Sequence, residues 1–158
     1  MRLTGTVEDY LKALLSLATG GGAARTVALA EWLGVSAAAA TIMLQRLAAA
    51  GMVEYAPYRG ARLTRRGRTE AVRVVRRHRI LETFLVSELG FSPDAVHPEA
   101  ERLEHAASDA LIEAMARVLG EPETDPHGSP IPAAVKGRRT GAAREASPNI
   151  MTAATQAA

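Results

Sequence analysis

The chain has 158 residues, of which 47% are hydrophobic and only 4% aromatic, and it contains no cysteine. The absence of cysteine excludes disulfides and thiolate metal sites, and a core built mostly from Ala, Leu and Val favours helices. No apolar run is long enough to span a membrane. Leu11 to Ala18 is also too short for a signal peptide and lacks the basic lead, so we expect a cytoplasmic protein without a membrane partner.

Charge is divided unevenly along the chain, although the net charge is only +2. Residues 1–79 contain 13 Lys and Arg against 5 Asp and Glu, whereas residues 80–126 contain 2 against 11. The basic first part favours a polyanion as partner, and the acidic second part favours cations or metal. The alternative is a dipolar surface that binds neither.

The first half of the chain predicts three short helices. Apolar residues at helical spacing predict a helix from Glu8 to Ala18. Thr26 to Leu33 predicts a second helix that ends at Gly34, and Ser36 can cap a third helix that reaches about Ala50. Helix, tight glycine turn and helix form the helix-turn-helix pattern.

Two short strands around a basic turn follow, at Met52 to Tyr55 and Ala61 to Thr64, and they predict a wing. In a winged helix-turn-helix the second helix of the motif enters the major groove of double-stranded DNA, while the wing and nearby Arg side chains bind phosphates. The groove-facing residues here offer few hydrogen-bonding groups, so base readout would depend on thymine methyl groups and DNA shape. The candidate DNA-binding residues are Ser36, Ala38, Ala39, Thr41, Ile42, Arg46, Arg59 and Arg62.

The second half predicts two longer helices. Thr64 can cap a helix that runs to about Leu89, and another helix is expected from about Pro98 to Leu119. The packing face expected for the latter consists of Leu103, Ala107, Leu111, Ala114 and Val118. We therefore expect a mainly α protein with a winged helix-turn-helix domain over residues 1–73, a helical domain over 74–135 and a disordered tail over 136–158.

The second half also carries the residues with the clearest chemistry. Four ligand-type residues lie at i, i+4, i+7 and i+8, on one face of the expected helix: His97, Glu101, Glu104 and His105. His78 and Glu82 share a face of the preceding helix in the same way. Imidazole nitrogens and carboxylate oxygens without sulfur suit a divalent first-row metal. The same residues could instead be solvated positions on amphipathic helices, with each carboxylate paired to an Arg.

From about Thr6 to Pro132 the chain resembles the diphtheria toxin repressor family of metal-dependent transcriptional regulators. The resemblance is carried by these motifs: Val7-Glu8-Asp9-Tyr10-Leu11, Leu29-Ala30-Glu31-Trp32-Leu33-Gly34-Val35-Ser36, Leu63-Thr64-Arg65-Arg66-Gly67-Arg68, Arg77-His78-Arg79-Ile80-Leu81-Glu82, the stretch from Val96 to His105, and Pro126-His127-Gly128-Ser129-Pro130-Ile131-Pro132. It implies that the helical domain binds metal and mediates dimerisation. It also implies a homodimer that binds a palindromic operator when loaded with metal, as a repressor of metal-homeostasis genes.

By position, the resemblance implies two metal sites. The ancillary site would be formed by His78, Glu82 and His97, and the primary site by Asp9, Glu101, Glu104 and His105. A metal at the primary site would tie the first helix to the dimerisation helix. With acidic residues at Asp9 and Glu101, the chain resembles the manganese-responsive members of the family. The iron-responsive members have sulfur-bearing residues at these two positions. We expect Mn²⁺, with Fe²⁺ as the alternative, and Co²⁺, Ni²⁺ or Zn²⁺ as substitutes in vitro.

The chain departs from the family pattern in three ways. Lys12 lies three positions after Asp9, where the family's manganese-selective members have a further acidic residue. We therefore do not expect their close two-metal cluster here. His97 is more typical of the iron-responsive type. The SH3-like domain of longer members is not expected in a chain of this length, and His127 is interpreted as a loop residue rather than an accessory ligand.

Two other functions remain open at this stage. One is a metal-independent winged-helix regulator whose ligand-type residues form structural ion pairs. The other is a metal-dependent hydrolase, which would need an open coordination position and a general base. The sequence shows no nucleophile motif, no glycine-rich phosphate loop and no paired Glu-x-x-His, so we expect neither an enzyme nor a small-molecule substrate.

Overall fold

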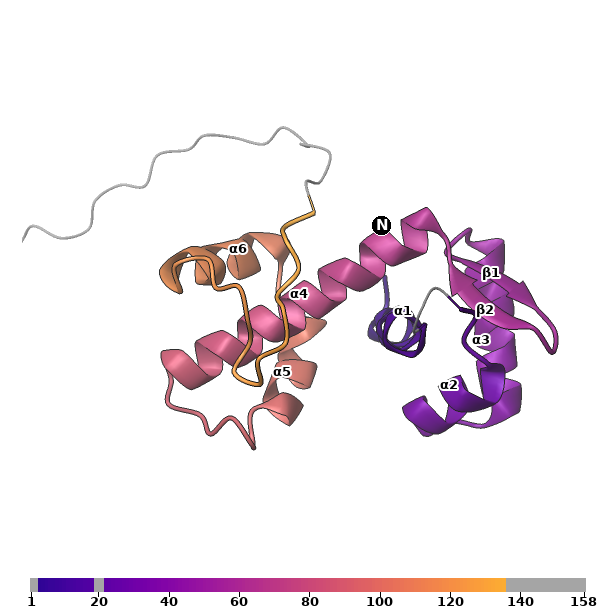
Figure 1. Ribbon diagram of the computed structural model, residues 1–158, viewed down its shortest axis with the longest axis horizontal. Helices are drawn as coiled ribbons and strands as arrows, with labels where there is room; N and C mark the ends of the chain where they lie inside the picture. Colours follow the sequence, from indigo (N-terminus) through magenta and orange to yellow (C-terminus); the bar gives the residue numbers. More distant parts are fainter. Residues whose placement is uncertain (1–2, 19–21, 136–158) are drawn as a thin grey trace, which may run out of the picture.

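The computed structural model describes residues 3–18 and 22–135, which form six helices and one two-stranded sheet (Figure 1). The elements are α1 (Gly5–Leu17), α2 (Thr26–Leu33), α3 (Ala37–Ala49), β1 (Val53–Ala56), β2 (Gly60–Leu63), α4 (Arg65–Ser87), α5 (His97–Glu104) and α6 (Asp109–Val118). This architecture confirms the mainly α fold class and the wing. The predicted disordered tail, residues 136–158, lies outside the described residues.

Local signals in the sequence account for the helix-turn-helix. Gly34 follows α2 in the left-handed conformation, with φ of 65°, and the Ser36 side chain accepts a hydrogen bond of 3.1 Å from the Ala39 amide at the start of α3. Both the turn and the cap were predicted. Within the described residues no single helix is both long and apolar enough to cross a membrane, and α2 and α3 pass that test only as a pair bent by 109°.

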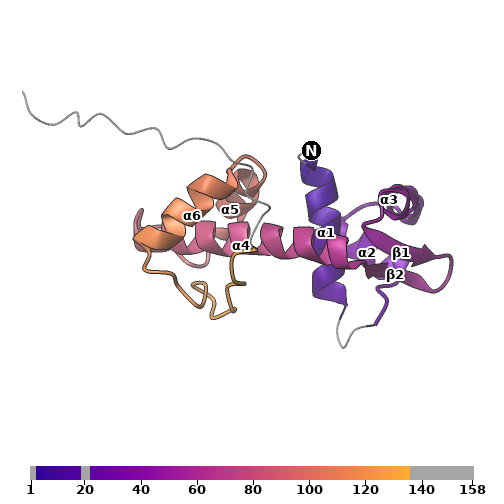
Figure 2. The same cartoon turned by 90° about the horizontal axis from the view of Figure 1, so that it is seen from above.

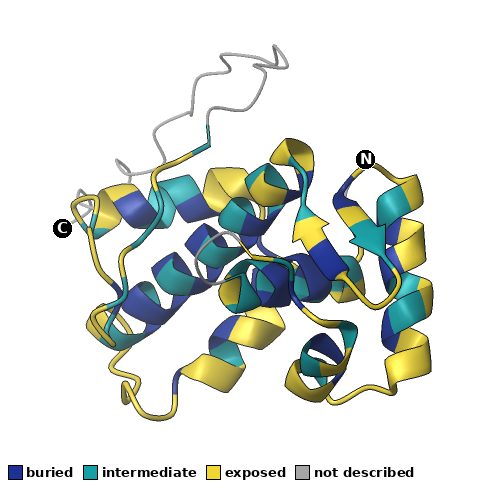
Figure 3. Cartoon of the chain, turned by 45° about the vertical axis from the view of Figure 1, so that its right-hand side comes forward, coloured by how far each residue is buried: buried dark blue, intermediate teal, exposed yellow. Residues whose placement is uncertain are grey.

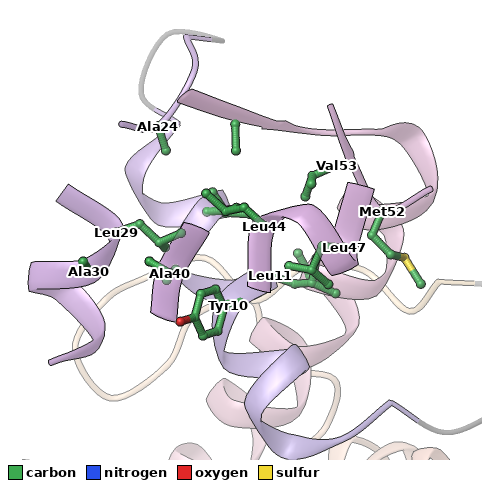
Figure 4. Packing of buried hydrophobic residues seen from close by; sticks show 14 residues of the cluster. Tyr10, Leu11, Ala24, Leu29, Ala30, Ala40, Leu44, Leu47, Met52 and Val53 are labelled. Atoms are coloured by element: carbon green, nitrogen blue, oxygen red, sulfur yellow. The ribbon is translucent and has the colours of Figure 1, made fainter. Parts of the chain in front are cut away.

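A hydrophobic cluster holds α1, α2, α3 and the wing together. Tyr10 and Leu11 of α1 meet Leu29 of α2 and Leu44 and Leu47 of α3, as Figure 4 shows from close by. Burying one such leucine side chain contributes about 1.5–3 kcal/mol to stability. Because α1 is part of this cluster, it belongs with α2, α3 and the wing to one unit of the fold. We call it the DNA-binding unit after the function expected from the sequence.

The wing is an antiparallel hairpin in which Val53 pairs with Leu63 and Ala56 with Gly60. Its strands lie within one residue of the predicted ones. Gly60 has φ of 89°, and its backbone passes so close to the Ala24 carbonyl that a Cβ there would overlap the oxygen. The segment before α2 is thereby held along β2 by the Ala24 to Ala61 bridge.

The long helix α4 connects two separate hydrophobic clusters. Ala71, in its first half, belongs to the cluster of the DNA-binding unit. Ile80 and Leu81, in its second half, pack with Ile112 and Ala116 of α6 in the other cluster. Figures 1 and 2 show α4 extending from the wing to α5 and α6, with α1 lying across it. In Figure 3 the buried residues gather in the middle of the molecule, and the outward-facing sides of the outer helices are mostly exposed.

The prediction of one continuous helix from Pro98 to Leu119 is wrong. The helix stops at Glu104, and α6 begins after Ser108, whose side chain accepts a hydrogen bond of 3.2 Å from the Leu111 amide. Ser108 followed by Asp109 is a helix-start signal, which the spacing of apolar residues alone does not reveal.

The break also turns the packing face of this segment. Ile112 and Ala116 are buried, whereas Leu103, Leu111 and Val118 of the predicted face are 40%, 47% and 65% exposed. Apart from Ala107, which is buried, the predicted face therefore does not form the core.

Gly67 offers a test of how α4 docks on the DNA-binding unit. The first turn of α4 lies against the Met52 carbonyl oxygen, and a Cβ on Gly67 would overlap it. We expect Gly67→Ala to lower the free energy of unfolding by about 1–3 kcal/mol, although alanine alone favours a helix by about 1 kcal/mol. Thermal unfolding measures this, with exposed Arg68→Ala as the control on the same turn. A stabilised Gly67→Ala variant would contradict the docking.

Candidate metal centre

The first group of ligand-type residues lies between α4 and α5. His78 Nε2 is 2.9 Å from Glu82 Oε1 and 3.0 Å from His97 Nδ1, and His97 Nδ1 is itself 2.9 Å from Glu82 Oε1. The two residues of α4 are buried, while the His97 side chain is 57% exposed. The structure thus brings together the three residues expected at the ancillary site, with solvent on the side of His97.

Hydrogen bonds set the charge of this group. Burial alone would lower the pKa of His78, but hydrogen bonds to Glu104 and Glu82 outweigh it and raise the pKa to about 9. Burial would raise the pKa of Glu82, yet hydrogen bonds from His78 and His97 lower it to about 2. In this arrangement His78 is an imidazolium that donates from both ring nitrogens, to Glu104 Oε2 at 2.7 Å and to Glu82.

The second group joins α1 to the end of α5. His105 Nε2 lies 3.0 Å from Asp9 Oδ1 and 3.6 Å from Glu104 Oε1, and ligand atoms of all three residues fall within 4.8 Å of one another. Burial raises the pKa of Asp9, whereas hydrogen bonds from His78 and Lys12 outweigh burial at Glu104 and lower its pKa. The first turn of α1 approaches closely, because a Cβ on Gly5 would lie 3.1 Å from His105 Cγ.

Glu101, the fourth residue expected at the primary site, does not join this group among the described residues. Its side chain is 50% exposed, and its Oε1 lies 3.3 Å from His97 Nε2 and 3.7 Å from Lys12 Nζ. Glu101 therefore stands between the two groups rather than inside the second.

Glu8 is a site residue that no sequence motif indicated. This buried carboxylate is 2.7 Å from His105 Nδ1 through Oε2 and accepts a hydrogen bond of 2.7 Å from Arg77 Nη2 through Oε1. Arg77 also donates to the Glu104 carbonyl at 3.2 Å. Glu8 thus orients the imidazole of His105, and only its position directly before Asp9 could have indicated this.

A third group contains Glu82, Asp125 and His127, whose ligand atoms also lie within 4.8 Å of one another. His127 lies in a loop, as predicted, but its Nδ1 is 3.6 Å from Glu82 Oε2 while its Nε2 donates to the Pro93 carbonyl at 2.9 Å. Asp125 is buried and was not singled out from the sequence. Glu82 is therefore shared by two groups.

The candidate DNA-binding residues lie on α3 and the wing. Ala38, Ala39 and Ile42 form an exposed face of α3, which Arg46 extends. The hydroxyls of Ser36 and Thr41 are engaged with the backbone of α3, at Ala39 and Ala37 respectively. On the wing, Arg59 lies in the hairpin turn and Arg62 on β2, and both are exposed. The structure therefore presents a mostly apolar helix face beside two exposed guanidinium groups.

The donor chemistry of all three groups fits a divalent metal. Each offers imidazole nitrogen and carboxylate oxygen without sulfur, the combination that suits Mn²⁺, Fe²⁺ and their neighbours in the first row. The residues that would hold the ion are His78, Glu82 and His97 in the first group and Asp9, Glu104 and His105 in the second.

Two family profiles match the chain. The profile described as "Iron dependent repressor, N-terminal DNA binding domain" matches residues 2–61, and the one described as "Iron dependent repressor, metal binding and dimerisation domain" matches residues 64–133. Both describe parts of transcriptional repressors, not of enzymes, so the hydrolase alternative is not supported.

Similar proteins include both iron-named and manganese-named regulators. The iron-dependent repressor IdeR of Mycobacterium tuberculosis is 34% identical over 134 residues, which cover 85% of this chain and 58% of the relative. The transcriptional regulator MntR of Escherichia coli O157:H7 is 39% identical over 108 residues, covering 68% of this chain and 69% of the relative.

A solved structure described as a manganese-dependent transcriptional repressor in complex with manganese is 46% identical to this chain, with a TM-score of 0.75. The match covers 81% of this chain and 59% of that one. The chain thus spans somewhat less than two thirds of several relatives that it matches. Two family profiles over most of the chain and this degree of identity confirm the resemblance seen in the sequence: the chain belongs to the iron-dependent repressor family, which includes the diphtheria toxin repressor.

Proposed function

We propose that this protein is a metal-dependent transcriptional repressor that binds a palindromic DNA operator as a homodimer when its metal sites are loaded. One observation carries the proposal. Asp9 comes from α1 of the DNA-binding unit, whereas Glu104 and His105 come from the end of α5, and their ligand atoms converge within 4.8 Å. This convergence supports a metal site that is formed by residues of both units.

The protein's own groups determine what happens at this junction. A divalent metal bound there would supply two positive charges between carboxylates that belong to different units. Glu8 holds His105 in place through Nδ1, so that Nε2 is directed toward Asp9. Fixing α1 against α5 also fixes α3, since α1 and α3 share one hydrophobic cluster. Metal binding would then supply the free energy needed to order the DNA-binding unit before DNA binds.

Mn²⁺ is the metal we favour, with Fe²⁺ as the alternative. Neither ligand group contains sulfur, and oxygen with imidazole suits Mn²⁺. The similarity to a solved manganese-dependent repressor supports this choice, while the similarity to iron-named repressors supports the alternative.

A second copy of the chain would cover the exposed apolar residues of the helical unit. Leu111, Met115 and Val118 follow one another at helical spacing on α6, and Leu111 and Val118 are largely exposed. The match to a dimerisation domain supports this surface as the dimer contact. We also propose that the DNA-binding domain ends at residue 73, inside α4, and that the protein is cytoplasmic.

Asp9→Asn tests the metal dependence. The variant keeps the size of the side chain but removes a charged ligand, so we expect at least roughly ten-fold more Mn²⁺ to be needed for half-maximal operator binding. An operator is first selected from random duplexes with Mn²⁺, and fluorescence anisotropy then gives the affinity at fixed ionic strength with Mn²⁺, Fe²⁺ or chelator. Glu99→Gln is the matched control, since Glu99 pairs with Arg102 on α5 outside the ligand groups.

The proposal fails if operator affinity of the wild-type protein is the same with chelator and with every metal. It also fails if Asp9→Asn and Glu99→Gln give the same metal titration as the wild type. Fixed ionic strength is essential because added salt alone weakens DNA binding.

The wing supplies a separate prediction about DNA contact. Arg59→Ala and Arg62→Ala should each weaken binding to all duplexes similarly and lower the salt dependence of log K by about one unit, because each removes one phosphate contact. Arg102→Ala, at an exposed position of α5, should leave the salt dependence unchanged. Equal salt slopes for wild-type and wing variants would show that the wing does not contact phosphates.

A metal-independent regulator is the second candidate, and one observation favours it. His78, Lys12 and Arg77 already pair with the carboxylates of Glu82, Glu104 and Glu8, so the acidic residues are balanced by cations of the protein. Operator binding that is tight in chelator would support this function over the first.

The same pairing predicts how the chelated protein responds to pH. Since folding raises the pKa of His78 from 6.5 to about 9, its contribution to stability is complete below pH 6.5 and lost as the pH rises through 9. Glu82, lowered from 4.5 to about 2, contributes above pH 4.5 and stops contributing as the pH falls through 2. Thermal unfolding with chelator should therefore show a loss of stability from pH 6.5 to 9 that His78→Gln lacks. An equal alkaline loss in both proteins would contradict the assignment.

A further inference from the structure

Lys12 of α1 lies inside the cluster of candidate ligands. Its Nζ donates a hydrogen bond of 2.7 Å to Glu104 Oε1 and lies 3.7 Å from Glu101 Oε1. The lysine side chain is 20% exposed, whereas the Glu104 side chain is completely buried. The ammonium group therefore faces a carboxylate from which water is excluded, and it links the DNA-binding unit to α5.

Both oxygens of Glu104 have close partners. Lys12 occupies Oε1, and His78 Nδ1 lies 2.7 Å from Oε2. Oε1 is the oxygen on the side of the second ligand group, because His105 Nε2 lies 3.6 Å from it. A cation held by Asp9, Glu104 and His105 would therefore need the oxygen that Lys12 holds.

We propose that Lys12 competes with the metal for Glu104 and so sets the metal concentration at which this group fills. The inference rests on the proposed function, since it takes Asp9, Glu104 and His105 as the metal ligands. Two unit charges at this distance interact strongly when they are shielded from water, and salt screens them little. Displacing the ammonium group from Oε1 opposes metal binding, and the positive charge of Lys12 repels a second cation placed beside it.

In the metal-free protein the same contact has a second effect. It gives the buried carboxylate of Glu104 a counter-charge from another helix, and so holds α1 against α5. Lys12 thus stabilises the metal-free junction and weakens metal binding there. These two effects have opposite signs when Lys12 is removed, which distinguishes competition from a purely structural role.

Lys12→Met is the variant that tests the inference, because it keeps the length of the side chain without the charge. We expect Mn²⁺ to bind roughly ten-fold more tightly, equivalent to about 1.4 kcal/mol. Isothermal titration calorimetry on the full chain without DNA measures this affinity. The melting temperature in chelator should fall by roughly 5–10 °C, since the buried carboxylate of Glu104 loses one of its two cationic partners.

Trp32 gives a second readout through Lys12, because the two side chains line the same hollow and Lys12 must leave Glu104 when the metal binds. It is the only tryptophan of the chain, and it lines a hollow of about 330 Å³ together with Lys12, His78, Glu82 and Glu101. Its fluorescence during the Mn²⁺ titration should change at lower metal concentration in Lys12→Met than in the wild type.

Arg76→Met is the matched control. Arg76 pairs with Glu113 at 2.9 Å and donates to the Pro132 carbonyl, away from the ligand groups. Its loss should lower the melting temperature and leave Mn²⁺ affinity unchanged. Lys12→Arg, which keeps the charge, should bind Mn²⁺ no more tightly than the wild type. If Lys12→Met does not fold, Lys12→Gln retains a donor to Oε1 and should still show tighter binding.

Tighter Mn²⁺ binding together with a lower melting temperature in chelator supports the inference. Unchanged or weaker binding by Lys12→Met or Lys12→Gln, with the wild type binding Mn²⁺ normally, overturns it and leaves the proposed function intact. A wild-type protein that binds no divalent metal in calorimetry overturns the proposed function itself, and the role of Lys12 with it.

Discussion

The contact between α1 and α5 is electrostatic, and it joins the two units of the fold beside the continuous helix α4. Each unit has its own hydrophobic cluster, and the two clusters share no residue. The groups that face one another at the junction are ionisable: Glu8 and His105, Asp9 and His105, Lys12 and Glu104. Apolar packing responds little to ions, whereas opposed charges respond directly to an added cation. A DNA-binding unit held in this way can be sensitive to metal while its own core remains unchanged.

Burying charged groups at the junction between α1 and α5 costs folding free energy. Glu104 is completely buried, and the buried Nε of Arg77 has no hydrogen-bond partner among the described residues. Replacing a buried ion pair by packed apolar side chains is often neutral or stabilising, while removing one partner costs about 3–5 kcal/mol. A fold selected only for stability would not need the carboxylates of Glu8, Asp9, Glu82, Glu101 and Glu104 between α1, α4 and α5. The proposed binding of a further cation accounts for their presence.

Features set by neighbouring residues were predictable from the sequence, and features set by distant ones were not. The Gly34 turn and the caps at Ser36 and Thr64 depend on a few adjacent residues, and the structure has them. His78, Glu82 and His97 were grouped from helical spacing and family resemblance. The pairing of Lys12 with Glu104 joins residues 92 positions apart, so no local pattern reports it. Helical spacing predicts that Glu101 and His105 share a helix face, but α5 ends at Glu104. The carboxylate of Glu101 faces His97 instead.

The ligand groups are also connected to one another through His78. Its Nδ1 contacts Glu104, a member of the group that reaches α1, and its Nε2 contacts Glu82, which belongs to the other two groups. Movement of Glu104 toward Asp9 would lengthen its bond to His78, and the imidazole would then be free to turn toward Glu82 and His97. Conversely, withdrawal of Glu82 from His78 would leave Nε2 with His97 Nδ1, 3.0 Å away, as its remaining close partner. Because one imidazole contacts both Glu104 and Glu82, a change in either group alters the hydrogen bonding of the other.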